Sequence, residues 1–290
     1  MCGRYAASKD QAELVEELDI ELDATGEPSR SILANPQHPP AGTPDWNMAP
    51  TKQAFVVLTR APRTSETRTC ETRAPAAEPS GAVRQLRLVT WGLVPSWSKD
   101  TRTGLRMINA RAESVLDKPG FAKAAASRRC LVPADGWYEW QVSPTATDAK
   151  GKPRKQPFFM HRADGDLVTM AGLYEFWRDR SVDDPDDPDA WLTTFTIITT
   201  SAEPGLDRVH DRQPLVLERE HRDRWLDPQL RDVDEVRDLL AFSSPGRFEA
   251  YPVTSAVSAT RNNGAELLRP LPRDELRGVV DPVTGEVVGE

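Results

Sequence analysis

Short apolar segments separated by turn-forming residues most strongly limit how this chain can fold. One of them, VRQLRLVTWGLVP at 83–95, alternates and then becomes apolar, as a strand entering a core does. Similar patterns predict further strands at 54–58, 128–133, 136–141, 156–162, 167–177, 194–200, 213–217 and 248–253. The chain is therefore predicted to be rich in β-structure.

Helical spacing is confined to a few segments. Residues 8–19 place Leu14, Val15 and Leu18 on one face after Ser8, a capping residue. Further helices are predicted at 116–126, 218–226 and 233–242, and a loop at 20–45. The predicted fold class is α+β: a single domain with a strongly bent antiparallel β-sheet, or barrel-like core, flanked by a few helices.

Composition along the chain predicts the domain limits. One domain is expected over 1–270, interrupted by a polar, Pro-rich insert at 61–82 and an acidic loop at 179–189. Residues 271–290 are predicted to form a flexible tail. The net charge of −8 argues against a nucleic-acid partner. The acidic loop and the acidic tail carry all of this excess, however, and distant exposed charges are screened beyond about 10 Å.

The sequence also suggests where the protein works. It lacks an apolar run long enough to cross a bilayer and lacks the pattern of a signal peptide. Its three cysteines, Cys2, Cys70 and Cys130, are an odd number, which argues against a disulfide framework. We therefore expect a cytoplasmic protein without a membrane partner.

Cys2 directly follows the initiator methionine. If Met1 is removed, Cys2 carries a free α-amine and a thiol two carbons apart, which together form a specialised nucleophile. If Met1 stays, Cys2 is a thiol near a mobile chain end, which is the commoner situation for a single terminal cysteine. The residues around Cys2 leave both interpretations open.

Several other polar residues stand in unusual places. Glu139 lies between aromatic residues in PADGWYEW, within a predicted buried strand, where a carboxylate must be paired or have a raised pKa. INARAE contains Asn109 and Arg111, and VHDRQPLVL contains His210 and Arg212. Taken singly, each of these residues also fits an ordinary ion pair, turn or hydrogen bond.

Motifs for other chemistries are missing from the sequence. It contains no Gly-rich phosphate loop, no G-x-S-x-G, no C-x-x-C and no H-E-x-x-H. A zinc site built from Cys2, Cys130 and a histidine has no supporting ligand spacing. We predict neither a metal nor a cofactor.

A series of motifs in a fixed order carries a family resemblance. The series is MCGRY, WNMAPT, WGLVPSW, INARAE, CLVPADGWYEW, QPFFM, AGLYEFW, TIITTSA and VHDRQPLVL, followed by NNGAELL at 262–268. Over residues 2–270 the sequence resembles the SRAP family, the SOS-response-associated peptidase proteins that shield abasic sites in DNA. The insert, the acidic loop and the tail lie outside the resemblance.

The resemblance implies a mechanism and a set of site residues. Autocatalytic removal of Met1 would expose Cys2, which would form a covalent thiazolidine crosslink with an abasic site, with lyase-type and reversal chemistry. The implied catalytic residues are Cys2, Asn109, Glu139 and His210. The implied DNA-binding residues are Arg4, Arg111 and Arg212 on phosphates, and Asn47, Pro50 and Trp140 along the strand path.

The resemblance also implies partners and location. The expected ligands are single-stranded DNA and single-strand/double-strand junctions that contain abasic sites. The protein would act as a monomer and would be nucleoid-associated when engaged on DNA. Two alternatives from other classes remain. One is an N-terminal-nucleophile Cys amidohydrolase or peptidase, acting on other substrates or only on itself, and the other is a non-catalytic single-strand DNA-binding protein.

Overall fold

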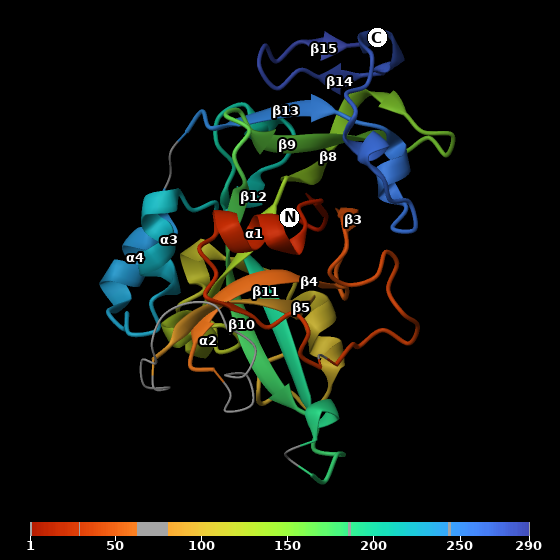
Figure 1. Cartoon of the computed structure of the whole chain (residues 1–290). Coiled ribbons are helices and arrows are strands. Elements are labelled where there is room, and N and C mark those ends of the chain that lie inside the picture. The colour runs from red at the N-terminus through yellow and green to blue at the C-terminus, as the bar shows by residue number, and fades with distance from the viewer. Residues whose placement is uncertain (1, 29, 63–80, 185–186, 243–244, 290) are drawn as a thin grey trace.

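Two main β-sheets dominate the computed structural model, which describes residues 2–28, 30–62, 81–184, 187–242 and 245–289 (Figure 1). The strands are β1 (Tyr5–Ala7), β2 (Leu22–Asp23), β3 (Asp45–Met48), β4 (Gln53–Arg60), β5 (Val83–Trp91), β6 (Asn109–Arg111), β7 (Arg129–Ala134), β8 (Gly136–Thr147), β9 (Pro153–Arg162), β10 (Val168–Arg178), β11 (Trp191–Ser201), β12 (Arg212–Pro214), β13 (Phe248–Pro252), β14 (Val279–Val280) and β15 (Val287–Val288). Every strand predicted from the sequence is present, with shifted ends.

The larger sheet closes on itself. Its strand order is β12-β11-β10-β7-β4-β5-β2, and β5 also pairs in parallel with β11 through Thr90–Thr194 and Trp91–Phe195. The closed ring therefore consists of β11, β10, β7, β4 and β5, and the Trp91 and Phe195 rings stack with centroids 6.1 Å apart. The barrel-like α+β core predicted from the sequence is confirmed.

Alternation along the barrel strands separates two cores. In β4, Ala54, Val56 and Leu58 join one buried cluster, whereas Phe55 and Val57 join another. The first cluster also contains side chains of the second sheet, and the other contains side chains of the helices. The strands of the barrel are therefore buried on both faces.

The second sheet has the order β13-β9-β8-β1-β3. The amino-terminal strand β1 is internal: Tyr5 pairs with Trp137 of β8 and with Met48 of β3. Along β8, Trp137 faces the first core cluster and Tyr138 faces a separate cluster, as strand alternation requires. Glu139 accordingly lies on the Trp137 side of the strand.

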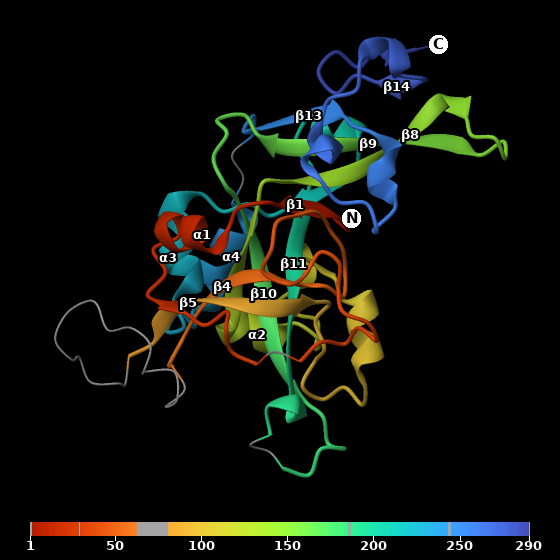
Figure 2. The same ribbon diagram turned by 45° about the vertical axis from the view of Figure 1, so that its right-hand side comes forward.

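The helices α1 (Gln11–Glu17), α2 (Ala122–Ser127), α3 (Arg219–Leu226) and α4 (Val233–Ala241) cover the barrel, and α1, α3 and α4 gather on one side of it (Figure 2). The predicted helix at 8–19 begins later than expected because Asp10, not Ser8, forms the capping box with Glu13. The predicted helix at 116–126 is shortened by the Pro119-Gly120 turn that precedes it. Among the described residues no helix has both the length and the apolar character needed to cross a membrane.

Short 3₁₀ helices of one or two turns connect these elements. They are η2 (Thr101–Arg106), η3 (Ala112–Ser114), η4 (Pro188–Ala190), η5 (Leu206–Arg208), η6 (Ser255–Ser258), η7 (Ala265–Leu268) and η8 (Arg273–Glu275). The predicted acidic loop at 179–189 includes η4, and Asp179 forms an ion pair with Arg30 at 2.8 Å. Residues 185–186 of that loop, and residues 63–80 of the predicted insert, lie outside the described residues.

The carboxy-terminal segment differs from the predicted flexible tail. Strands β14 and β15 form a hairpin beside β13 (Figures 1 and 2). Leu276 and Val279 are buried in the first core cluster, and the Val280 N–H donates to Gln141 Oε1 at 2.8 Å. Burial of these apolar side chains holds residues 271–289 against the domain, which the acidic composition of the segment did not indicate.

Gly136 at the start of β8 is expected to be essential for stability. An added Cβ would lie 2.2 Å from the Met160 carbonyl oxygen and 2.5 Å from the Phe159 ring. Gly136→Ala should therefore lower the free energy of unfolding by about 1–3 kcal/mol, as overpacking does. Urea unfolding would measure this. Gly26→Ala is the control, because a Cβ there meets nothing within 4 Å and should change stability by less than about 0.5 kcal/mol.

Candidate active site

Cys2 is held inside the protein by strand β1. It is 0% exposed and belongs to the first core cluster with Tyr5 and Trp137. Asn109, at the start of β6, donates from Nδ2 to the Cys2 carbonyl oxygen at 2.7 Å. Two of the predicted catalytic residues, 107 positions apart in the chain, are therefore in direct contact.

The surroundings of the Cys2 thiol keep it protonated. Burial raises the thiol pKa well above its ordinary range, and the negative charge of Glu139 raises it further. Since the thiolate is the reactive form of cysteine, this thiol needs a neighbouring base to react near neutral pH.

Glu139 is the acidic residue whose charge acts on the Cys2 thiol. It is 3% exposed in β8, and burial raises the pKa of its carboxyl to about 7. The negative charge of Asp211 acts in the same direction, and the positive charge of the amino terminus opposes it. The predicted burial of Glu139 is confirmed, and a carboxyl with this pKa can take up or release a proton near neutral pH.

His210 follows η5 and is half-buried. Burial lowers the pKa of its imidazole, which favours the neutral form of the ring. The Arg212 N–H donates to His210 Nδ1 at 3.1 Å, which assigns the proton of the neutral ring to Nε2. The Asp211 carboxylate, 3.0 Å from the same Nδ1, would pair with the protonated ring.

Arg4 and Trp140 lie next to each other. The Arg4 guanidinium lies 5.9 Å from the centre of the Trp140 ring and donates to Asn47 Oδ1 at 2.6 Å. The Trp140 Nε1–H donates to Ser258 Oγ at 3.1 Å. Both side chains are partly exposed, which suits the predicted contact with a strand of DNA.

The structure corrects the predicted place of Asn47. Its side chain is 0% exposed, so it does not line a surface path. Its Nδ2 donates to the carbonyl oxygens of Val257, Ala259 and Asn262, at 3.2, 3.1 and 2.8 Å. Asn47 therefore ties β3 and Arg4 to the loop around η6. Pro50 is half-buried in the next turn, where the Thr51 N–H donates to the Trp91 carbonyl at 2.8 Å.

Arg212 is also not free to bind a phosphate as predicted. Its Nη1 and Nη2 donate to the two carboxylate oxygens of Glu113 at 2.6 and 2.9 Å, and Nη2 also reaches the Thr199 carbonyl at 2.6 Å. A phosphate would have to replace Glu113 to form a forked contact. Arg111, two residues before Glu113, is exposed and suits the predicted contact as it stands.

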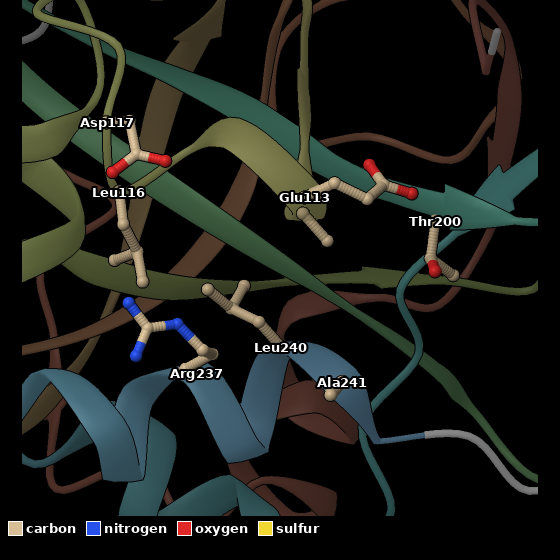
Figure 3. Close-up of a pocket in the computed structure, with 8 residues that line it drawn as sticks. Glu113, Leu116, Asp117, Thr200, Arg237, Leu240 and Ala241 are labelled. Carbon is tan, nitrogen blue, oxygen red and sulfur yellow. The ribbon is translucent and has the colours of Figure 1, made fainter.

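A separate hollow lies between η3 and α4. Figure 3 shows Leu116 and Leu240 facing each other across it, with Arg237 and Asp117 at one end and Thr200 at the other. Glu113 reaches into the Thr200 end, and its carboxylate is committed to Arg212. The hollow therefore borders the Arg212 ion pair and is distinct from the Cys2 site.

No sequence pattern pointed to Gln141, which lies two residues after Glu139 in β8. It is 2% exposed and bonds to Arg208, 67 positions away, and to Val280, 139 positions away. An isolated glutamine with partners so distant in the chain has no recognisable spacing.

Comparison with known proteins gives consistent matches. The family model described as SOS response associated peptidase (SRAP) matches residues 1–260. The abasic site processing protein YoqW of Bacillus subtilis is 31% identical over 92% of this chain and 99% of that protein. The abasic site processing protein YedK of Escherichia coli is 28% identical over 93% of this chain and 100% of that protein.

A solved structure shares the fold. A crystallised protein from Bacteroides thetaiotaomicron superimposes with a TM-score of 0.65 at 20% identity, covering 93% of this chain and 100% of that chain. At this level of identity the likeness concerns the architecture.

The raised pKa of Glu139 predicts a pH-dependent stability. The folded state holds the carboxyl proton up to about pH 7, whereas the unfolded chain releases it near the ordinary glutamate pKa of 4.5. The folded state therefore binds more protons between these values, and the free energy of unfolding should fall as pH rises through this window. The slope is at most about 1.4 kcal/mol per pH unit.

Glu139→Gln should lack this contribution because an amide does not titrate. Urea unfolding of both proteins between about pH 5 and about pH 8 would test it. The wild type should lose about 1–3 kcal/mol relative to the variant across that range. A difference between the two proteins that stays constant with pH would contradict the assignment.

Proposed function

Because the chain belongs to the SOS response associated peptidase (SRAP) family, we propose that it processes abasic sites in DNA, the activity for which its relatives YoqW and YedK are named. The observation that carries the proposal is a buried Cys2 thiol that feels the charge of the buried Glu139 carboxyl, whose pKa is about 7. The substrate would be the ring-opened aldehyde of an abasic deoxyribose.

The chemistry follows from a cysteine at the chain end. Once Met1 has been removed, which the protein would do itself, the Cys2 α-amine adds to the aldehyde carbon and one water leaves to give an imine. The Cys2 Sγ then bonds to the same carbon, and the thiol proton ends on the imine nitrogen. The product is a five-membered thiazolidine. An internal lysine would stop at the imine, so the reaction requires an amine and a thiol on one residue.

The neighbouring groups supply proton transfers and orientation. Glu139 would take the thiol proton and deliver a proton to the leaving hydroxyl, and the same transfers in reverse would release the DNA. Neutral His210 would assist opening of the sugar ring. Asn109 would hold the Cys2 backbone through its 2.7 Å hydrogen bond and would leave its Oδ1 for the sugar.

The expected ligand is single-stranded DNA or a single-strand/double-strand junction, bound by a monomer. Arg111 and the Arg4–Trp140 pair would contact phosphates and bases without reading sequence. Binding there would place the protein on the nucleoid. Lyase-type strand cleavage would proceed through the imine, before the sulfur closes the ring.

Cys2 provides the direct test. Wild-type protein should gain the mass of one DNA strand on incubation with an abasic single-stranded oligonucleotide, and intact-mass measurement would also show loss of Met1. Cys2→Ala should form no heat-stable adduct, and Cys2→Ser at most a labile one. Glu139→Gln should form the adduct about 10²–10⁴-fold more slowly, the usual contribution of a proton-transfer group.

The control in this experiment is an oligonucleotide with intact bases, which should give no adduct. A Cys2→Ala protein that crosslinks as stably as the wild type would overturn the mechanism. Hydrolysis of amide substrates without any adduct would favour the amidohydrolase alternative.

The ion pair between Glu113 and Arg212 gives a second prediction. Arg4→Ala, Arg111→Ala and Arg212→Ala should each weaken binding to intact single-stranded DNA and reduce its salt dependence by about one phosphate contact. Glu113→Gln should strengthen binding roughly two- to fivefold, since it removes an exposed competing charge worth about 0.5–1 kcal/mol. Fluorescence anisotropy at several salt concentrations would measure both. Weaker binding by Glu113→Gln would mean that Glu113 instead holds Arg212 in its productive position.

A further inference from the structure

Gln141 stands two residues after Glu139 on the same face of β8. Its side chain is 2% exposed, and its amide is fully engaged. Nε2 donates to the Arg208 carbonyl at 3.0 Å and to the Val280 carbonyl at 2.9 Å, and Oε1 accepts from the Val280 N–H at 2.8 Å. One side chain thus joins the strand of Glu139, the segment before His210 and the carboxy-terminal hairpin.

The hairpin reaches the same segment a second time. Arg208, two residues before His210, donates from Nη1 to the carbonyls of Pro282 and Val283 at 2.7 and 2.9 Å. These carbonyls belong to the turn between β14 and β15, and a Cβ at Gly285 in this turn would lie 3.3 Å from the Arg208 guanidinium. The Arg208 side chain is therefore bonded to the hairpin directly. Its backbone carbonyl is bonded by Gln141, which also bonds to the hairpin.

The hairpin residues in these contacts lie beyond the part of the chain that the family model matches. The family model ends at residue 260, whereas Val280, Pro282 and Val283 follow it. Leu276 and Val279 bury the base of the hairpin in the same core cluster as Cys2 and Trp137. Apolar packing of Leu276 and Val279 and hydrogen bonds with Gln141 and Arg208 thus attach the hairpin to the domain.

We propose that Gln141 and the carboxy-terminal hairpin are positioning elements that fix the segment of His210 and Asp211 relative to the strand that carries Glu139. This inference rests on the proposed function for its kinetic consequence, but the geometry it describes can be measured separately. Asp211 is one of the charges that act on Glu139, so the place of the 208–211 segment affects how both acid–base groups titrate. If Gln141 and the hairpin only stabilised the fold, disrupting their contacts would leave the titrations of His210 and Glu139 unchanged.

The chain offers a matched control in Gln156. This glutamine is 3% exposed in β9 and donates from Nε2 to the carbonyls of Pro157 and Val253 at 3.0 and 2.7 Å. Gln141→Met and Gln156→Met each replace a buried bridging amide by an apolar chain of similar size. Arg208→Ala is a third variant that releases the hairpin turn and keeps Gln141.

Three quantities would be measured for each variant: the melting temperature, the NMR titration of the His210 ring, and single-turnover crosslinking to an abasic oligonucleotide as a function of pH. Both glutamine variants should lower the melting temperature. Gln141→Met alone should raise the His210 pKa toward its ordinary value and slow crosslinking about tenfold or more. The pH profile of crosslinking should also shift toward lower pH, because Asp211 moves away from Glu139. Arg208→Ala should change the same quantities in the same direction by less.

The outcomes separate the two proposals. A Gln141→Met protein with the His210 titration and the pH profile of the wild type overturns the positioning role and leaves the proposed function intact. If the wild type forms no adduct, the proposed function fails, and the His210 titration still decides whether Gln141 positions that ring. If Gln141→Met does not fold, Arg208→Ala decides the question, and an unchanged titration there counts against the proposal.

Discussion

The pairing of β1 between β8 and β3 is the constraint on which the rest of the site depends. A strand of three residues has little stability of its own, so its place is imposed by its neighbours Trp137 and Met48. This pairing brings the start of the chain into the interior of a sheet. Cys2, three residues before Tyr5, is buried as a result, and Asn109 reaches its carbonyl from the adjoining barrel.

Burial then determines the chemistry of the two acidic groups. The Cys2 thiol and the Glu139 carboxyl each have a raised pKa because desolvation disfavours their charged forms, and the charge of Glu139 adds to the effect at Cys2. The Glu139 carboxyl can therefore exchange a proton near neutral pH, whereas the Cys2 thiol stays protonated there. The same burial destabilises the folded protein at alkaline pH, so the site has a cost in stability that the apolar packing of both sheets offsets.

Two of the arginines near the site have partners within the protein. Arg212 is neutralised by Glu113, and Arg4 is shared between Asn47, the Val257 carbonyl and the face of Trp140. Such contacts keep guanidinium groups ordered at a modest energetic cost. A DNA phosphate would compete with these partners, and the acidic net charge of the chain would make that competition sensitive to salt.

Local patterns alone were enough to predict the strands of the barrel, helices α3 and α4, and the burial of Glu139 between aromatic residues, since each depends on residues adjacent in the chain. The family motifs further indicated the contact between Asn109 and Cys2. The sequence did not indicate that Asn47 is buried and bonded to the loop around η6, or that Glu113 forms an ion pair with Arg212. It also did not indicate that residues 271–289 fold back onto Gln141 and Arg208. These features were decided by the tertiary structure, because a hydrogen bond or an ion pair depends on which distant segments the closed sheet brings within about 3 Å of each other.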